Sequence, residues 1–224
     1  MMNICYIACF ELTSLLWDLN EDRSNPYLNA LEDTTPENVC EFLSKWNRGR
    51  GYKKAILLEK LKINQGKLKK VPSSQNLEDY LKFANEVLKE VTGKPDEEYI
   101  GSVKLSHIYH PAIFPLVDNP ILERFGLNKF DAGDFEGFAR QYFCFKDAMD
   151  ESVRELGING IRVRGRGVYK LIDEVLYLFI TQEKSRIVET ILTITGNRLF
   201  VELISNMVQK LSANIEEFLA NGCT

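Results

Sequence analysis

Apolar residues recur at steps of three and four along most of this chain, and this spacing constrains the fold more than any other feature. The pattern is most regular near the carboxyl end, where it runs from Phe200 through Ile204 and Leu211 to Leu219. Such spacing places apolar side chains on one face of an α-helix. Comparable patterns predict helices over residues 4–19, 36–46, 52–62, 77–91, 96–109, 119–125, 134–156 and 168–180.

One segment, residues 186–195, is rich in the β-branched residues that favour strands. No other segment offers a convincing partner strand, and a lone strand leaves its backbone groups without hydrogen bonds. We therefore predict a helix there as well. The predicted fold class is all-α, a compact multi-helix domain over residues 1–224, with the alternative of two subdomains that meet near residues 93–118. Trp17 and Trp46 are assigned to its core.

The composition is typical of a globular protein, with 45% hydrophobic and 27% charged residues. The apolar stretch of residues 4–17 contains Glu11, lacks a basic segment before it and is too short to cross a bilayer, so we expect no membrane partner and no export signal. The five cysteines are scattered, without a CxxC pair or a Cys/His cluster at zinc spacing. We therefore expect reduced thiols, a cytoplasmic location and no metal or other cofactor.

Basic residues are concentrated in a stretch from Arg48 to Lys70, which contains nine basic residues and one acid. This stretch carries +8, although the whole chain has a formal charge of −4. A local cluster of this kind is typical of a surface that contacts nucleic-acid phosphates, and it is equally consistent with the solvated face of a helix. The candidates for DNA contact here are Arg48, Arg50, Lys53 and Lys54.

A second basic cluster is formed by Arg162, Arg164 and Arg166, which alternate with Val163, Gly165 and Gly167, and it continues to Lys170. Glycines next to arginines let both guanidinium groups and backbone N–H groups approach a phosphate. If the two clusters share a face, the protein has a footprint for DNA on an otherwise acidic body. The alternative is that these arginines have a purely structural role.

The sharpest candidates for chemistry are Lys104 and Asp118, which lie fourteen positions apart. The helix that contains Lys104 is expected to stop at His110-Pro111, and a short apolar link then leads to Asp118 at the start of the next helix. A neutral lysine amine can attack an electrophilic sugar carbon, and a carboxylate can stabilise the positive charge that develops there. The alternatives are an exposed helix lysine and a simple helix cap.

Two further features surround this pair. Gly101 and Ser102 come near the start of the same predicted helix and could offer backbone N–H groups to a phosphate. His107 and His110 are the only histidines, three positions apart, a spacing that can place two metal ligands on one face. No third ligand lies nearby in the sequence, so we favour a capping or interface role for both histidines.

Together these residues form a pattern of a lysine, a histidine three positions later, and then Pro111, Phe114-Pro115 and Asp118. It is preceded by a Phe-Leu-x-Lys-Trp segment at residues 42–46 and the basic stretch, and it is followed by an Asp-Glu-Val-Leu-Tyr segment at residues 173–177. The pattern resembles helix-hairpin-helix DNA glycosylases, notably proteins similar to 8-oxoguanine DNA glycosylase. The resemblance implies that Lys104 forms a Schiff base with the sugar and that Asp118 is its acid–base partner. It also implies that Gly101, the one glycine where the family hairpin usually has two, marks a hairpin that grips DNA. The target base would be flipped out of the duplex.

The resemblance therefore implies a DNA base-excision glycosylase/AP lyase-like enzyme. Two other functions fit the same residues. One is a non-catalytic helical protein that binds nucleic acid through the basic clusters. The other is a protein-interaction module that uses its long terminal amphipathic helix.

Overall fold

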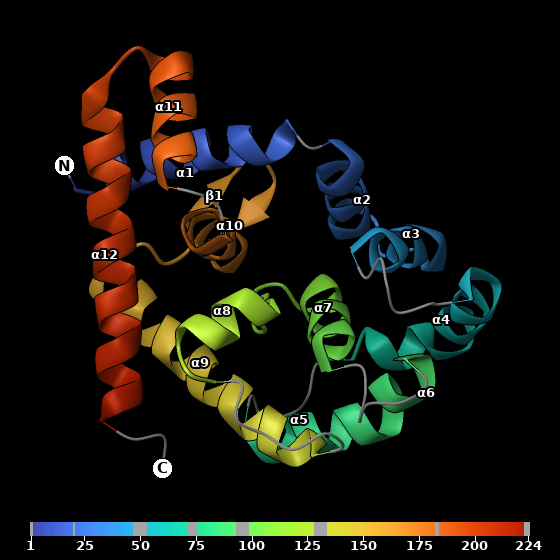
Figure 1. Cartoon of the computed structure of the whole chain (residues 1–224). Helices are drawn as coiled ribbons and strands as arrows, with labels where there is room; N and C mark the ends of the chain where they lie inside the picture. The colour runs from blue at the N-terminus through green and yellow to red at the C-terminus, as the bar shows by residue number, and fades with distance from the viewer. Residues whose placement is uncertain are drawn as a thin grey trace.

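The computed structural model describes residues 2–19, 21–46, 53–70, 76–92, 99–127, 134–181 and 184–221. Helices dominate this part of the chain, and the all-α prediction is confirmed (Figure 1). The elements, in chain order, are α1 (Met2–Asp18), α2 (Glu21–Glu32), α3 (Pro36–Trp46), α4 (Lys54–Leu68), α5 (Leu77–Phe83), the π-helical turn η1 (Ala84–Leu88), α6 (Lys89–Thr92), α7 (Tyr99–Tyr109), α8 (Asn119–Arg124), α9 (Phe135–Glu155), β1 (Arg162–Val163), β2 (Arg166–Gly167), α10 (Val168–Thr181), α11 (Lys184–Thr195) and α12 (Arg198–Ala220).

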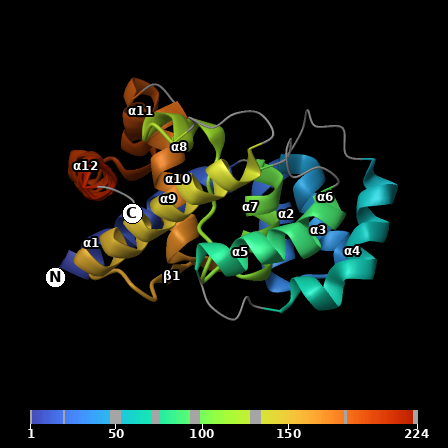
Figure 2. The same ribbon diagram turned by 90° about the horizontal axis from the view of Figure 1, so that it is seen from below.

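The helices form two groups that can be followed in both views (Figures 1 and 2). In one group, α3 packs against α2 and α4, and α4 packs against α6 and η1. In the other, α12 packs along α9 and α1, and α10 packs against α1 and α8. Helix α7 lies centrally and contacts α2, α3 and α6.

Helix α7 is buried on every side over residues 100–108. The reason is visible in its sequence, because its apolar residues are distributed around the helix instead of along one stripe. Several of its polar side chains have internal partners: the Ser106 hydroxyl donates to the carbonyl of Ser102 at 2.9 Å, and His107 Nδ1 donates to the carbonyl of Phe114 at 2.7 Å. Because buried polar groups need such partners, α7 can carry polar residues, Lys104 included, through the interior of the molecule.

The predicted helix over residues 186–195 is confirmed, since α11 continues to Thr195 with Ile187 and Ile191 buried. The hairpin of β1 and β2 is an addition to the predicted fold. Its turn uses Arg164 and Gly165, both with positive φ (50° and 79°), a conformation that glycine adopts readily. The resulting register pairs the residue before the turn with the residue after it and brings Arg166 back toward the core.

The expectation of reduced thiols is wrong for Cys144, which is disulfide-bonded, while Cys5, Cys9 and Cys40 are free. Cysteine spacing in a sequence does not reveal which thiols the fold brings within bonding distance, and this is the reason for the error. Over the ranges that the structure describes, no helix is both long and apolar enough to cross a membrane.

Candidate functional site

Lys104 and Asp118 are in direct contact. Lys104 Nζ lies 2.8 Å from Asp118 Oδ1, and the two side chains are 3% and 22% exposed. Asp118 occupies the position before α8, but its side chain makes no capping hydrogen bond to that helix. The alternatives of an exposed lysine and of a carboxylate that only caps a helix therefore do not describe this pair.

The surroundings of Lys104 combine polar and aromatic groups. Its Nζ lies 3.5 Å from the backbone carbonyl oxygen of Trp46 and 5.5 Å from the centroid of the Trp46 ring. An ammonium group near the face of an indole ring is stabilised by the ring quadrupole. Helices α3 and α7 and the start of α8 thus meet at Lys104, and Asp118 is the more exposed member of the pair.

A second buried lysine, Lys170 of α10, lies inside a box of aromatic rings. Its Nζ is 4.6 Å from the Trp17 centroid, 4.8 Å from that of Trp46 and 5.2 Å from that of Tyr27. The two indole rings are nearly parallel, with centroids 6.0 Å apart. Lys170 also donates to Asp173 Oδ2 at 2.6 Å. Lys170 thus has aromatic rings and a carboxylate as its buried partners.

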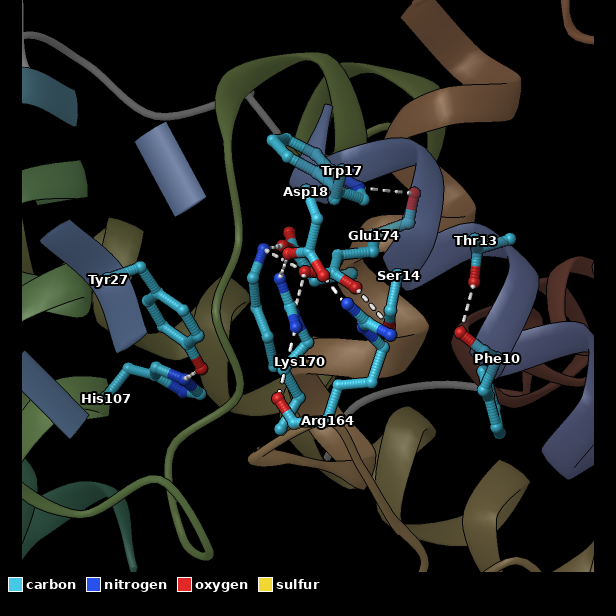
Figure 3. Close-up of polar contacts among 12 residues, drawn as sticks. Phe10, Thr13, Ser14, Trp17, Asp18, Tyr27, His107, Arg164, Lys170 and Glu174 are labelled. Atoms are coloured by element: carbon cyan, nitrogen blue, oxygen red, sulfur yellow. Dashed lines mark hydrogen bonds and ion pairs between the residues drawn. The ribbon is translucent and has the colours of Figure 1, made fainter. Parts of the chain in front are cut away.

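The charges continue from Lys170 into a buried network (Figure 3). Glu174 Oε1 lies 3.7 Å from Lys170 Nζ and accepts a hydrogen bond from Arg166 Nε at 2.7 Å. Arg166 also pairs with Asp18 of α1, which accepts from Arg164 Nε at 2.7 Å. The network alternates cations and carboxylates, so its charges are compensated although most of it is buried.

The network changes the ionisation of its members. Burial raises the pKa of Asp173 to about 6, and the negative charge of Asp118 adds to this effect. Burial also raises the pKa of Glu174. Burial alone would raise the pKa of Asp18, but hydrogen bonds from Arg166 and Arg164 lower it. Titratable groups with shifted pKa values are common at functional sites.

The two histidines are parts of the internal hydrogen-bond network. Because His107 Nδ1 donates to a carbonyl, its Nε2 accepts from the Tyr27 hydroxyl at 3.0 Å. Burial lowers the pKa of His107 to about 4, so its ring stays neutral. His110 Nε2 donates to the carbonyl of Leu68 at 2.9 Å. Within the described segments, no three His, Cys, Asp or Glu side chains gather in a way that could hold a metal ion.

The structure places the three arginines of the hairpin differently: Arg166 is buried, whereas Arg162 and Arg164 are exposed. Arg166 is only 1% exposed and is held by Asp18 and Glu174, so its guanidinium group cannot reach a phosphate. Arg164 is exposed but pairs with Asp18. Arg162 is exposed on β1. The prediction of DNA contact is therefore corrected for Arg166, because a carboxylate 148 positions away in sequence neutralises it.

In the basic stretch from Arg48 to Lys70, the structure describes two of the four candidates for DNA contact. Arg48 and Arg50 lie outside the described residues. Lys53 is exposed just before α4, and Lys54, also exposed, forms an ion pair with Glu41 of α3. In both views α2 and α3 lie between α4 and the hairpin (Figures 1 and 2).

Gly101 and Ser102, predicted to grip a phosphate, are both buried in α7. Ser102 has no exposed surface, and its hydroxyl has no hydrogen-bond partner among the described residues. Their burial removes them from the surface that a DNA backbone could contact, because α7 is packed on all sides. This part of the predicted site is corrected.

The sequence analysis placed Lys170 in the second basic cluster, whereas the structure buries it, and it assigned no role at the site to Asp173 or Glu174. A signal for them exists, because the three charges lie at steps of three and four on one face of an otherwise apolar helix. Charged residues on the buried face of such a helix must be paired inside the protein. Lys170 pairs with Asp173 and Glu174 on the same helix, but the other partners come from α1, α2, α3 and the hairpin, and no local pattern identifies those.

A comparison of the chain with protein-family models, curated proteins and solved structures finds no match.

Proposed function

We propose that the protein is a DNA base-excision glycosylase with AP lyase activity, in which Lys104 is the nucleophile and Asp118 is the acid–base partner. The observation that carries the proposal is the 2.8 Å contact between the buried Lys104 amine and the more exposed Asp118 carboxylate. Lys104 lies in α7 and Asp118 lies directly before α8, and the fold of the chain between them brings the two side chains together. The resemblance of the sequence from Lys104 to Asp118 to helix-hairpin-helix glycosylases supports the same roles.

The two lysines of the site differ in a way that favours Lys104 as the nucleophile. Lys170 is enclosed by three aromatic rings and contacts Asp173 and Glu174, and both of these carboxylates are almost fully buried. Lys104 pairs with Asp118, which retains exposed surface through which a substrate can approach. A nucleophile needs a nearby base that can accept its proton.

The proposed reaction begins when the Lys104 ammonium gives a proton to the Asp118 carboxylate. The neutral Nζ then forms a bond to C1′ of the deoxyribose, and the bond from C1′ to the base breaks with its electron pair leaving on the base. Asp118 returns the proton to the departing base. Opening of the C1′–O4′ bond, with transfer of a proton from Nζ to O4′, then produces a Schiff base between Lys104 and C1′. The target nucleotide must first leave the base stack, since its glycosidic bond is inaccessible within the duplex.

Borohydride trapping tests this proposal directly, because hydride converts the Schiff base into a stable secondary amine. We expect a covalent protein–DNA adduct with duplexes that contain 8-oxoguanine, uracil or an abasic site. Peptide mass spectrometry should place the adduct on Lys104, and Lys104→Gln should abolish it. Lys146→Gln is the matched control, because Lys146 is also a buried lysine (6% exposed) paired with an aspartate, Asp150 at 2.8 Å, but lies on α9 away from the site.

An adduct that survives in Lys104→Gln, or the absence of an adduct on every duplex with folded protein, would contradict a lysine nucleophile. Circular dichroism of each variant establishes that it is folded. A parallel assay for free base then separates an enzyme that releases bases without forming a Schiff base from a protein with no glycosylase activity.

The exposed lysines of α4 favour a second candidate function, binding of nucleic acid without chemistry. Lys53, Lys69 and Lys70 are exposed around this helix, and their charges are suited to phosphate contacts. In that case the protein binds duplexes in a strongly salt-dependent way and yields no trapped adduct. Binding that does not change with salt concentration would exclude it.

A further inference from the structure

Two residues that retain exposed surface lie against the nearly buried Lys104. One is Asp118, which is 22% exposed and pairs with Lys104 Nζ at 2.8 Å. The other is Trp46, the last residue of α3, which is partly exposed. The Trp46 carbonyl oxygen lies 3.5 Å from Nζ, and its ring centroid lies 5.5 Å from Nζ. The proposed reaction uses Asp118 and gives the Trp46 ring no role.

Other aromatic rings fix the orientation of Trp46. The Trp17 ring is nearly parallel to it, at 10° and with centroids 6.0 Å apart, and the ring of Phe42 lies 5.1 Å away. Trp17 is buried, and its Nε1 donates to the carbonyl of Glu174 at 3.3 Å. Trp46 is therefore the more exposed ring of an anchored stack, and its orientation is set before a ligand arrives.

We propose that the Trp46 ring is the surface on which the flipped base stacks, so that the site takes a planar nucleobase next to Lys104. The inference rests on the proposed role of Lys104. In the attack, Nζ approaches C1′ to about 3 Å, and the base is bonded directly to that carbon. Because the Trp46 centroid lies 5.5 Å from Nζ, a base on this carbon can reach the centroid distance of about 4.5–7 Å at which aromatic rings stack.

Stacking on Trp46 compensates the base for leaving the duplex. A flipped base gives up its contacts with neighbouring bases, and an aromatic side chain restores part of them, since every base has a flat face. An abasic sugar has no ring to place against Trp46. The ring should therefore matter for removal of a base and much less for Schiff base formation at a site that has already lost its base.

The test compares two substrates of the same enzyme by the rate of borohydride trapping. One is a duplex with 8-oxoguanine or uracil, and the other is the same duplex with a preformed abasic site. For Trp46→Leu, we expect the loss on the base-containing duplex to exceed the loss on the abasic duplex about five- to hundredfold. Trp46→Phe keeps an aromatic face and should restore most of this difference.

Phe125→Leu is the matched control, because Phe125 is also partly exposed and packs against an aromatic ring, that of Phe145 at 5.8 Å. Its rates on the two duplexes should change by the same factor. Equal losses on the two duplexes for Trp46→Leu, or no loss on either, would overturn the proposal, because Trp46 would then act on Lys104 or on the fold and not on the base. Circular dichroism establishes that each variant is folded.

Tryptophan fluorescence provides a second readout that needs no chemistry. The chain has two tryptophans, so Trp17→Phe reports on Trp46 alone and Trp46→Phe reports on Trp17 alone. Trp46 emission should be quenched more by the base-containing duplex than by the same duplex with a tetrahydrofuran abasic analogue, whereas Trp17 should not distinguish them.

Equal quenching of Trp46 by the two duplexes, including no quenching by either, also overturns the proposal. If the protein gives no trapped adduct but Trp46 still distinguishes the duplexes, the glycosylase proposal fails and base stacking on Trp46 stands. The two failures are therefore detected separately.

Discussion

The two basic stretches of this chain look alike in sequence, but their described residues differ in burial. Along α4, most lysines are exposed while Lys60 is partly buried, and those with acidic partners form ion pairs at the surface, such as Lys62 with Glu37 and Lys67 with Glu90. At the hairpin and α10, Arg166 and Lys170 are almost fully buried and are held by carboxylates. A count of basic residues therefore describes mainly surface charges in the first case, whereas in the second it includes Arg166 and Lys170, which belong to an internal scaffold.

The difference shows that the contribution of a charged residue to stability depends on its partner more than on its charge. Surface ion pairs are screened by water and salt and contribute little to stability. A buried ion has lost its hydration, so it depends on its partner, and removal of one member leaves the other uncompensated. Substitutions in the two regions should consequently have very different effects on folding.

The largest effect is expected for Arg166→Met. This change keeps much of the side-chain volume but leaves Glu174 and Asp18 without the guanidinium group that both contact. Loss of one member of a buried ion pair costs about 3–5 kcal/mol of unfolding free energy, which urea denaturation would measure.

The double variant Arg166→Met with Glu174→Met sharpens this result. Because both buried charges are then absent, its unfolding free energy should lie well above that of the single variant. A loss below about 1 kcal/mol for Arg166→Met would show that the hairpin cluster behaves like a surface ion pair, and the contrast with α4 would fail.

The sequence predicts those parts of the structure whose causes lie in neighbouring residues. The all-α class follows from helical spacing, and the helix over residues 186–195 follows from the lack of a partner strand. The hairpin was missed because its turn depends on Arg164 and Gly165 with positive φ, and Arg164 is of a type that rarely adopts it. Helical periodicity carries no information about such a turn.

The next effect concerns His107, whose neutral ring links Tyr27 to Phe114. Burial lowers its pKa from 6.5 to about 4, so the unfolded chain binds a proton that the folded protein does not. The stability that His107 contributes is complete above pH 6.5 and is lost as the pH falls toward 4, by about 3 kcal/mol. Urea denaturation at pH 7, 5.5 and 4 should therefore show the gap between wild type and His107→Gln narrowing with acidification.

Asp173→Asn should show the opposite trend in the same experiment. Its pKa is raised from 3.8 to about 6 by burial, so the contribution of Asp173 is complete below pH 3.8 and is lost as the pH rises through 6. The unfolding free energy of wild type should therefore rise relative to that of this variant on acidification. If the difference in unfolding free energy from wild type does not change with pH for either variant, the two groups do not titrate in opposite directions as assigned.

A smaller effect, about 2 kcal/mol, is expected for Lys170→Met. The loss is smaller than for Arg166→Met because Glu174 keeps Arg166 as a partner, and Asp173 can take up a proton when its lysine is absent. Urea denaturation at pH 7.5 and pH 5 would measure it, and the loss should be smaller at pH 5, where Asp173 is protonated. A loss equal to that of Arg166→Met at both values would show that the aromatic box depends on the cation more than this argument allows.

The site itself was predictable only where sequence neighbours make it. Lys104 and Asp118 were identified because a helix end and a short link bring them together within one continuous segment. Asp173 and Lys170 stand out as charges on an apolar helix, but their relation to Asp118 and Trp17 arises from packing between segments far apart in sequence. The prediction that Gly101 and Ser102 contact a phosphate was wrong for the same reason, since the burial of α7 depends on all of its neighbours.

The smallest effect on folding is expected on α4, where Lys69→Gln with Lys70→Gln removes two exposed charges at the end of the helix. The urea midpoint should stay within experimental error of wild type, because neither side chain is buried. If α4 is the surface that contacts phosphates, the slope of log K against log salt for duplex binding should fall by about two, since each phosphate contact contributes about 0.9. An unchanged slope would move the contact surface away from this end of α4. The basic stretch would then be a solvated helix face, and the comparison with the hairpin would contrast two structural roles.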